Sequence, residues 1–305
     1  MRRKGPGIPA ILVTGSQGQV GFELRRSFAP LGRIVALDRT GCDLSRTDEL
    51  RRLIRELRPD VIVNPAAYTS VDKAETDPAT AYAINGTAVA VLAEEAKALG
   101  ALLVHYSTDY VFDGRKHGAY VETDTVNPQS VYGKSKLVGE QAITATGATA
   151  VVFRTCWVAG AHGDNFAKTI LKLGRERDNL RVIADQFGAP TSAALIADVT
   201  AQIVARHWLL GDRVDFASGI YHLAASGETT WHGYATEVVR YAIAHGYALK
   251  VDPSRVEAIP ATAYPLPAPR PANSRMDTNK LCETFGIYLP DWRQGIHHLL
   301  DQILF

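Results

Sequence analysis

The stretch AILVTGSQGQVG, residues 10–21, decides the fold class of this chain. A short apolar run over residues 10–14 leads directly into a GxxGxxG pattern, and apolar residues with helical spacing follow over residues 19–29. Glycines at such a turn allow close backbone approach to a pyrophosphate, and the N-terminus of the following helix favours its negative charge. A glycine turn alone occurs in many α/β proteins. Its place directly after a first strand predicts the opening βα unit of a dinucleotide-binding domain.

The same alternation of short apolar runs and amphipathic segments continues to about residue 155. Strands that are apolar throughout are buried on both faces of a sheet, and helices between them make the strands parallel. We therefore predict an α/β protein with a doubly wound parallel sheet of the Rossmann type, which binds ligands at the carboxyl ends of its strands. The further predicted strands are residues 34–37, 61–63, 102–106 and 149–153, and the further predicted helices are residues 48–57, 79–99 and 130–146.

The pattern loosens in the second half of the chain. A stretch with five prolines, residues 259–272, is predicted to be a loop because proline lacks the backbone donor. We predict a dinucleotide-binding Rossmann domain over residues 8–155 and a smaller C-terminal substrate-binding lobe over residues 156–305, which folds back onto the first domain. Predicted helices in this lobe are residues 165–177, 193–207, 231–244, 278–285 and 292–303, with short strands near residues 181–183 and 220–223.

Composition narrows the class of partner. The 305 residues carry a net charge of +1, so no global field draws the chain to nucleic acid or to an anionic membrane. Cys42, Cys156 and Cys282 are far apart without a CxxC spacing, which favours free thiols in a reducing compartment. The basic N-terminal arm precedes an apolar run too short for a signal peptide or a membrane span. We expect a cytoplasmic monomer or homodimer that acts on a small molecule.

The end of the second predicted strand bears on the choice of cofactor. Asp38 lies 17 residues after Gly21, near the spacing at which an acidic residue binds the adenosine ribose of NAD. The neighbouring Arg39 suits the 2′-phosphate of NADP, which Asp38 would repel. The two residues indicate opposite cofactors, and a solvated strand end is the alternative for both.

Two further motifs carry groups that can transfer protons. Tyr132 and Lys136 form a YxxxK pair on a predicted helix, where residues at i and i+4 share a face. A Lys ammonium that close is expected to lower the pKa of the phenol and make it a usable acid or base near neutral pH. Thr108 lies at the carboxyl end of a predicted strand, where its hydroxyl can donate to a substrate oxygen or simply cap a turn.

These motifs together resemble the extended short-chain dehydrogenase/reductases. The resemblance rests on GxxGxxG, on NPAA at residues 64–67, on STDYVFDG at residues 107–114 and on YxxxK. Within that superfamily the chain is similar to dTDP-4-dehydrorhamnose reductases, through NPAAYTSVDKAE, RTCWVAG, DQFGAPT and SGETTW. The likeness runs from about residue 11 to about residue 292, nearly the whole chain.

The resemblance implies reduction of the 4-keto group of dTDP-4-dehydro-β-L-rhamnose to dTDP-L-rhamnose, with NADPH as cofactor and NADH as the alternative. In this pattern Tyr132 is the general acid, Lys136 lowers the pKa of Tyr132 and holds the nicotinamide ribose, and Thr108 orients the keto oxygen. The cofactor-binding residues that the resemblance and the glycine motif imply are Gly15, Gln17, Gly18, Gln19, Val20, Asp38, Arg39, Asp43, Leu44, Ala66, Ala67, Tyr68, Asn85, Tyr132 and Lys136.

Substrate contacts follow from the same resemblance. The aromatic rings at the implied substrate positions suit stacking on the thymine or the sugar. For the two tryptophans among them, Trp157 and Trp231, packing in the core is the alternative. Arg270 and Arg275 flank the proline-rich loop and suit a diphosphate, with a solvated position as the alternative. The expected substrate-binding residues are Thr108, Asp109, Tyr110, Trp157, Asn165, Trp231 and Arg275.

Two other functions stay open at this point. One is a related epimerase or dehydratase acting on another nucleotide sugar, although Asp109-Tyr110 stands where a dehydratase has an Asp-Glu pair. The other is a non-catalytic subunit that binds a dinucleotide, such as the regulatory subunit of methionine adenosyltransferase. Some relatives join subunits through a metal held by glutamates. Glu23 matches one such position, but residues 192–195 contain no carboxylate, which argues against a metal-bridged dimer. We name no metal ligand, and a metal requirement stays open.

Overall fold

The computed structural model describes residues 7–304, so most of the expected N-terminal arm lies outside the described residues. Its centre is a six-stranded sheet with the strand order β10-β5-β4-β3-β1-β2, in which every neighbouring pair is parallel. This sheet confirms the predicted parallel α/β fold. The strands are β1 (Ala10–Val13), β2 (Arg33–Ala36), β3 (Val61–Asn64), β4 (Leu102–Thr108), β5 (Ala150–Thr155) and β10 (Gly219–His222).

The strand order reverses direction at β1. The chain proceeds from β1 to β2 on one side and then crosses to β3, β4 and β5 on the other side. Loops that leave β1 and β3 therefore diverge to opposite faces, and their separation opens a crevice at the carboxyl ends of these strands. The glycine turn and the polar end of β4 both face this crevice.

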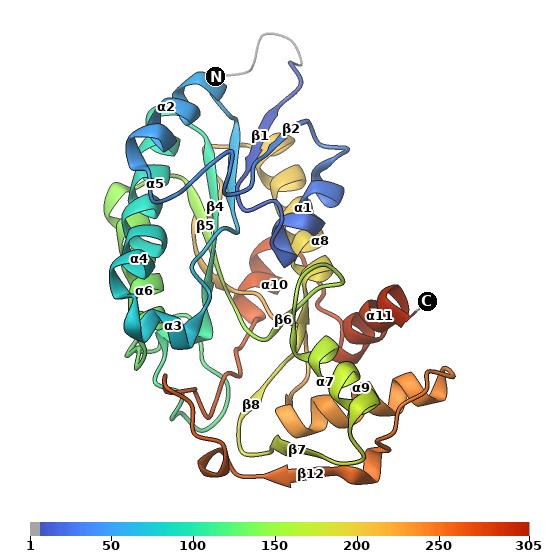
Figure 1. Cartoon of the computed structure of the whole chain (residues 1–305). Helices are drawn as coiled ribbons and strands as arrows, with labels where there is room; N and C mark the ends of the chain where they lie inside the picture. Colours follow the sequence, from blue (N-terminus) through green and yellow to red (C-terminus); the bar gives the residue numbers. More distant parts are fainter. Residues whose placement is uncertain (1–6, 305) are drawn as a thin grey trace.

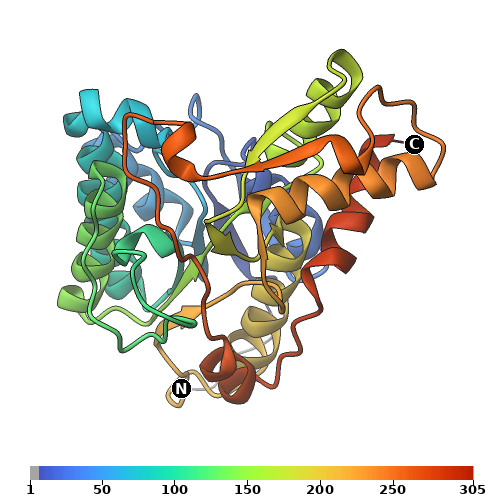
Figure 2. The same ribbon diagram turned by 90° about the horizontal axis from the view of Figure 1, so that it is seen from below.

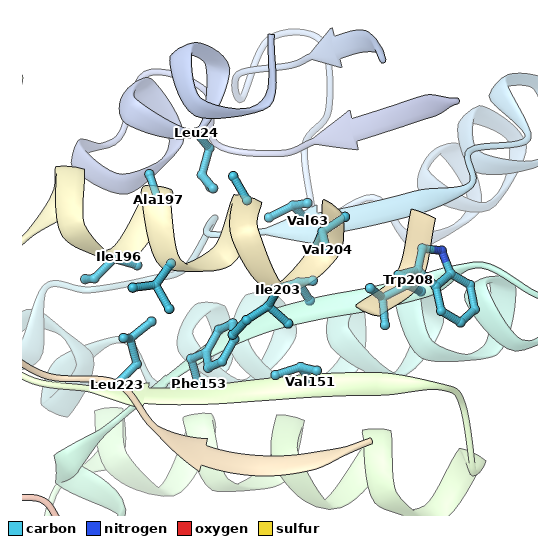
Figure 3. Close-up of a cluster of buried hydrophobic side chains, with 14 of the residues drawn as sticks. Leu24, Val63, Val151, Phe153, Ile196, Ala197, Ile203, Val204, Trp208 and Leu223 are labelled. Carbon is cyan, nitrogen blue, oxygen red and sulfur yellow. The ribbon is translucent and has the colours of Figure 1, made fainter. Parts of the chain in front are cut away.

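Helices cover both faces of the sheet, as Figure 1 shows. The core between the sheet, α1 and α8 is apolar, and Figure 3 shows Leu24 of α1 and Ile196 of α8 facing Val63 and Phe153 of the strands. A second apolar layer lies on the opposite face, around Leu50, Ile54 and Leu92. The covering helices are α1 (Gln19–Phe28) and α8 (Ala193–Ile203) on one face, and α2 (Thr47–Leu57), α5 (Ala88–Leu99) and α6 (Val131–Thr146) on the other.

The long helix predicted over residues 79–99 is interrupted in the structure. It consists of α4 (Pro78–Tyr82), a π-helical turn η1 (Ala83–Thr87) and α5. The turn fits closely against α6, since a Cβ on Gly139 would lie 2.3 Å from the carbonyl oxygen of Asn85. A short helix, α3 (Val71–Thr76), was not predicted because six residues are too few to show a helical period.

The second half of the chain builds a smaller apolar cluster of its own. Helices α7 (Phe166–Glu176), α9 (Trp231–Ala244) and α11 (Trp292–Leu304) pack around it, beside the parallel pair β7 (Leu180–Ile183) and β12 (Val256–Ile259). The remaining elements are the pairs β6 (Val158–Ala159) with β9 (Thr191–Ser192) and β8 (Phe187–Gly188) with β11 (Thr229–Thr230), the helix α10 (Asn279–Phe285), and the short turns η2 (Asp109–Val111), η3 (Val204–Leu209), η4 (Pro253–Arg255) and η5 (Ala261–Ala263).

The two halves are interleaved. Strand β10 and helix α8 come from the second half of the chain but complete the sheet and its cover. In the other direction, the segment after β12 crosses to α3, as Figure 2 shows, where Arg270 pairs with Asp72 at 2.7 Å. The domain boundary at residues 155/156 stays a prediction. Within residues 7–304, no helix combines the length and hydropathy that a bilayer crossing requires.

Candidate active site

A cleft of about 780 Å³ lies at the carboxyl ends of the sheet strands. The glycine turn, the ends of β2, β3, β4 and β5, the start of α6 and the first residue of α9 form its walls. Most of the residues that the sequence singled out meet here. The predicted residues that line the cleft are Gly15, Gln17, Gly18, Gln19, Val20, Asp38, Arg39, Asp43, Leu44, Ala66, Ala67, Tyr68, Thr108, Asp109, Tyr110, Tyr132, Lys136, Trp157 and Trp231.

The glycine turn forms a cradle that has no room for side chains. Gly15 adopts a φ of +54°, and a Cβ there would lie 2.9 Å from Ala66. A Cβ on Gly21 would lie 2.1 Å from the carbonyl oxygen of Gly15, so this glycine lets α1 start directly under the turn. The free backbone N–H groups at the start of α1 and the absence of Cβ atoms fit the pyrophosphate of a dinucleotide.

Asp38 and Arg39, the two residues that bear on the choice between NAD and NADP, line the same cleft as the glycine turn. Asp38 accepts hydrogen bonds from the backbone N–H and hydroxyl of Thr40 and from the N–H of Gly41, and these lower the pKa of its carboxyl. The carboxylate charge is thus already partly compensated. The Arg39 side chain is 81% exposed and lies 3.9 Å from Asp43 Oδ2, so it is free to turn toward a cofactor phosphate.

The three residues expected to be catalytic all line the cleft. Thr108 ends β4 and lines the cleft with Tyr132 of α6, close enough for its hydroxyl to lower the pKa of the phenol. The Tyr132 ring stands edge-on to Tyr110, with ring centroids 5.5 Å apart. Lys136 Nζ lies one helical turn further along α6, donates to the carbonyl oxygen of Tyr106 at 2.5 Å and lies 3.2 Å from His105 Nε2.

The expected lowering of the pKa of Tyr132 by Lys136 is wrong for this structure. Burial raises the pKa of Tyr132 to about 12, opposed by the hydrogen bond with Thr108 and reinforced by Asp109. Burial also lowers the pKa of Lys136 to about 8, opposed by Glu140. The cause is that the Lys136 nitrogen contacts Tyr106 and His105, while the phenol is removed from water. Tyr132 therefore keeps its proton at neutral pH.

Two tryptophans close the opposite end of the cleft. Trp157 and Trp231 are half-buried and stack with ring centroids 3.7 Å apart and planes 17° from parallel. Trp157 has a φ of +47°, a conformation that a bulky residue rarely adopts. Gly188 makes room for it, since a Cβ there would lie 2.7 Å from the indole. Both indoles therefore combine packing against Phe166 and Gly188 with a face on the cleft.

Three predicted site residues lie outside the cleft wall. Asn85 is buried behind it and binds both backbone groups of Tyr68 and the hydroxyl of Ser135. Asn165 caps α7 and donates to Gln19 Oε1 at 3.2 Å. Arg275 pairs with Glu228 at 3.2 Å and lies over the ring of Phe187, 5.3 Å from its centroid. We propose that Asn85 and Asn165 act on the site through Tyr68 and Gln19.

Sequence reasoning missed several residues at the site. Ser107 and Thr155 belong to the cleft wall, and their hydroxyls are buried without a hydrogen-bond partner in the structure. Ser274 donates to Asp109 from a distant segment, and His105 reaches Lys136 from β4. A polar residue inside an apolar strand, such as His105, is a signal that the sequence does offer.

Glu23, which matches the metal-binding position considered above, contacts an arginine in this structure. Glu23 is buried and accepts a hydrogen bond from Arg26 Nε at 3.1 Å. Among the residues that the structure describes, no three His, Cys, Asp or Glu side chains gather in a way that could hold a metal ion.

The sheet, the glycine cradle and the Thr108, Tyr132 and Lys136 set together define an extended short-chain dehydrogenase/reductase. The family model described as the RmlD substrate binding domain matches residues 9–305, and the chain belongs to this family. Two curated relatives carry the name dTDP-4-dehydrorhamnose reductase. The protein of Burkholderia thailandensis is 50% identical over 286 residues, covering 94% of this chain and 96% of the relative. The Escherichia coli protein is 46% identical over 297 residues, covering 96% and 97%.

Solved structures are similar over the same span. A dTDP-4-dehydrorhamnose reductase from Clostridium acetobutylicum superposes with a TM-score of 0.88 at 32% identity, covering 97% of this chain and all of the other. One from Bacillus anthracis, solved in complex with NADP, gives a TM-score of 0.86 at 30% identity with the same coverage. These comparisons confirm the family that the motifs indicated.

Proposed function

We propose that the chain reduces the 4-keto group of dTDP-4-dehydro-β-L-rhamnose to give dTDP-L-rhamnose, with NADPH as the hydride donor and NADH as the alternative. One observation carries the proposal: Thr108 and Tyr132 line the same cleft as the glycine cradle and the two stacked tryptophans. A ketone between these two ends lies within reach of a dinucleotide and of a proton donor. The named relatives and the NADP-bound structure support the same reaction.

Tyr132, Thr108 and Lys136 have separate roles in the proposed reduction. The bound cofactor supplies the hydride to the carbonyl carbon. Tyr132 holds its proton at neutral pH and donates it to the oxygen, which becomes a hydroxyl. Thr108, whose hydroxyl lowers the pKa of the Tyr132 phenol, is proposed to orient the same oxygen. Lys136, with a pKa of about 8, is charged below that pH and is proposed to hold the nicotinamide ribose by donating to its hydroxyls.

The nucleotide sugar is proposed to extend toward the tryptophans. The half-buried indoles of Trp157 and Trp231 and the ring of Tyr110 all line the cleft and suit contact with a base or a sugar. Asp109 is buried beside Thr108 and orders the polar end of β4. We keep Arg275 as a proposed diphosphate ligand, which requires it to exchange its contact with Glu228 for phosphate oxygens.

A direct assay tests the reaction. The protein is mixed with NADPH, or separately with NADH, and with dTDP-4-dehydro-β-L-rhamnose made in situ, and oxidation of the nicotinamide is followed by absorbance. Substrate-dependent oxidation is expected, and the ratio of the two rates ranks the cofactors. Binding of a cofactor without any oxidation would instead favour another nucleotide sugar, or the non-catalytic dinucleotide-binding subunit.

A matched pair of variants tests the role of Tyr132. Tyr132→Phe should lower kcat by roughly 10²–10⁴-fold while NADPH binding is retained, because only the proton donor is removed. Tyr234→Phe is the control, since it removes a buried tyrosine hydroxyl that has no hydrogen-bond partner and lies in the second apolar cluster, away from the cleft. Equal turnover of the two variants would contradict the assignment of Tyr132.

The setting of the enzyme is part of the proposal. Cys42 and Cys156 are buried free thiols, and Cys282 is a partly exposed one, as expected for a reducing compartment. These free thiols support the proposal that the protein acts in the cytoplasm, on a small nucleotide sugar. The predicted monomer or homodimer is open to measurement by light scattering.

A further inference from the structure

A chain of buried polar groups runs from β1 to the catalytic lysine. The Thr14 hydroxyl lies 2.6 Å from Asn64 Oδ1, Asn64 Nδ2 lies 3.1 Å from His105 Nδ1, and His105 Nε2 lies 3.2 Å from Lys136 Nζ. All four side chains are at most 2% exposed. Thr14 directly follows β1, Asn64 and His105 lie in β3 and β4, and Lys136 lies in α6, so only the folded sheet brings these groups together.

The charge of His105 is restricted by its surroundings. Burial, together with the nearby Lys136, lowers the pKa of the imidazole well below its usual range, so the ring is neutral. The charged groups nearest to the chain are Lys136 itself and Glu140 on α6, and Glu140 is held by Arg154 of β5 through a buried ion pair. On the other side of His105, Asn64 of β3 presents only an uncharged amide.

A neutral imidazole has one N–H donor and one acceptor nitrogen. If Asn64 donates its amide hydrogen to Nδ1, then Nε2 carries the proton and must donate to Lys136, which requires an uncharged amine. If Lys136 is an ammonium, it donates to Nε2, and the proton then sits on Nδ1. In that case the Asn64 amide turns over, so that its oxygen accepts from Nδ1 and its nitrogen donates to Thr14. In both arrangements each link of the chain joins one donor to one acceptor.

We propose that Asn64 and His105 are positioning residues that hold the Lys136 nitrogen in either charge state by exchanging the tautomer of a neutral histidine. The charged arrangement carries three protons on Nζ and one on Nδ1. The uncharged arrangement carries two on Nζ and one on Nε2, and the fourth proton is released to solvent. The inference deepens the proposed function, because Lys136 belongs to the proposed catalytic set, but the tautomer itself is a property of the free protein.

Nitrogen NMR of the ligand-free protein tests the tautomer directly. With ¹⁵N-labelled histidine, the signals of His105 are identified by their loss in His105→Gln. We expect the protonated nitrogen to change from Nδ1 to Nε2 as the pH rises through about 8, where Lys136 loses its charge, with no doubly protonated form. One unchanged tautomer across this range, or a ring that becomes an imidazolium, would overturn the proposal. This result does not depend on turnover.

A variant of Asn64 gives an independent outcome. Asn64→Asp replaces an amide that can turn over with a carboxylate. When ionised, this carboxylate accepts a hydrogen bond from Nδ1–H of His105 but cannot donate one. It should hold His105 in the Nδ1–H tautomer and keep Lys136 charged to higher pH. If the variant switches tautomer at the same pH as the unmodified protein, Asn64 has no part in the network.

The pH profile of kcat/KM for NADPH oxidation separates positioning from structural support. His105→Leu removes the acceptor of the ammonium, a charge-assisted bond, so the Lys136 inflection should move to lower pH by about one unit. His105→Gln keeps a group that can donate or accept and should restore most of the profile. His222→Leu is the control, because His222 is also fully buried in the sheet but does not contact Lys136. If His105→Leu and His222→Leu lower kcat/KM equally at every pH, the role of His105 is structural.

Absence of turnover in the unmodified protein would count against the proposed reaction and leave the NMR result to decide this inference.

Discussion

Ser274 donates a hydrogen bond to Oδ2 of Asp109, although the two residues stand 165 positions apart in the chain. Thr108 donates to the other carboxylate oxygen at 3.0 Å, so the carboxylate is held from both sides. Ser274 is itself fixed by its backbone N–H, which donates to the carbonyl oxygen of Phe187 at 2.7 Å. The C-terminal segment therefore helps to set the orientation of Thr108 beside Tyr132.

This contact predicts the behaviour of variants at Ser274. Ser274→Ala leaves Oδ2 of the buried Asp109 carboxylate without its donor. The carboxylate is then free to turn and to displace the Thr108 hydroxyl, which donates to its other oxygen. We expect kcat to fall about tenfold and the free energy of unfolding to fall by about 1–3 kcal/mol, with the KM for NADPH unchanged. Ser274→Thr retains the hydroxyl and should recover most of kcat. Steady-state kinetics of the two variants decide the matter, and equal losses in both would indicate a packing effect instead.

The buried carboxyl of Asp109 predicts a pH-dependent stability. Burial raises its pKa to about 6, opposed by the hydrogen bonds from Ser274 and Thr108. In the unfolded chain the same carboxyl has a pKa of about 3.9. Because its pKa is higher in the folded protein, the free energy of unfolding falls as the pH rises from about 4 to 6, by roughly 3 kcal/mol in total. Asp109→Asn removes that penalty. Urea unfolding should show the variant gaining stability over the unmodified protein at pH 7 relative to pH 4.

A control of opposite sign is available in the same loop. Hydrogen bonds from the backbone of Arg115 and from Tyr120 lower the pKa of Asp113. A lowered pKa stabilises the fold above the unfolded value and is lost on acidification. Asp113→Asn should therefore lose stability at pH 7 relative to pH 4. If the two variants change in the same direction with pH, the inferred environment of Asp109 is wrong.

The glycine cradle predicts a graded response to alanine. A Cβ at position 21 meets the Gly15 carbonyl oxygen at 2.1 Å, whereas a Cβ at Gly18 lies 3.3 Å from the same atom. Gly21→Ala should displace the turn, destabilise the fold by about 1–3 kcal/mol and remove cofactor binding. Gly18→Ala should fold normally and bind NADPH more weakly. Fluorescence titration with NADPH measures both, and tight binding by Gly21→Ala would contradict the assigned cradle.

The exposed Arg39 predicts the choice between the two cofactors. Its side chain contacts only Asp43, at 3.9 Å, among the carboxylates of the described residues, while Asp38 is engaged by Thr40 and Gly41. An arginine free to turn suits the 2′-phosphate of NADPH. Arg39→Ala should raise the KM for NADPH about 10–100-fold and change the KM for NADH little. Parallel titrations of both cofactors test this, and equal effects on the two would assign the phosphate to another residue.

The local patterns of the sequence predicted most of the fold. Uniformly apolar strands and helical spacing gave the elements of the sheet within one or two residues, because these signals act over a few neighbouring positions. The interrupted helix at Ala83–Thr87 could not be predicted in this way. Its π turn depends on the close approach of α6 at Gly139, a contact between residues more than 50 positions apart.

The sequence by itself determined the class of the protein and the identity of its reactive groups. The glycine turn, Thr108, Tyr132 and Lys136 follow from short motifs whose spacing places them at strand ends and on one helix face. Tertiary structure decided how these groups behave. The raised pKa of Tyr132, the Ser274 to Asp109 bond and the His105 contact to Lys136 depend on removal from water and on neighbours from distant segments. Desolvation and long-range contacts leave no periodic trace in a sequence, and only the folded chain supplies them.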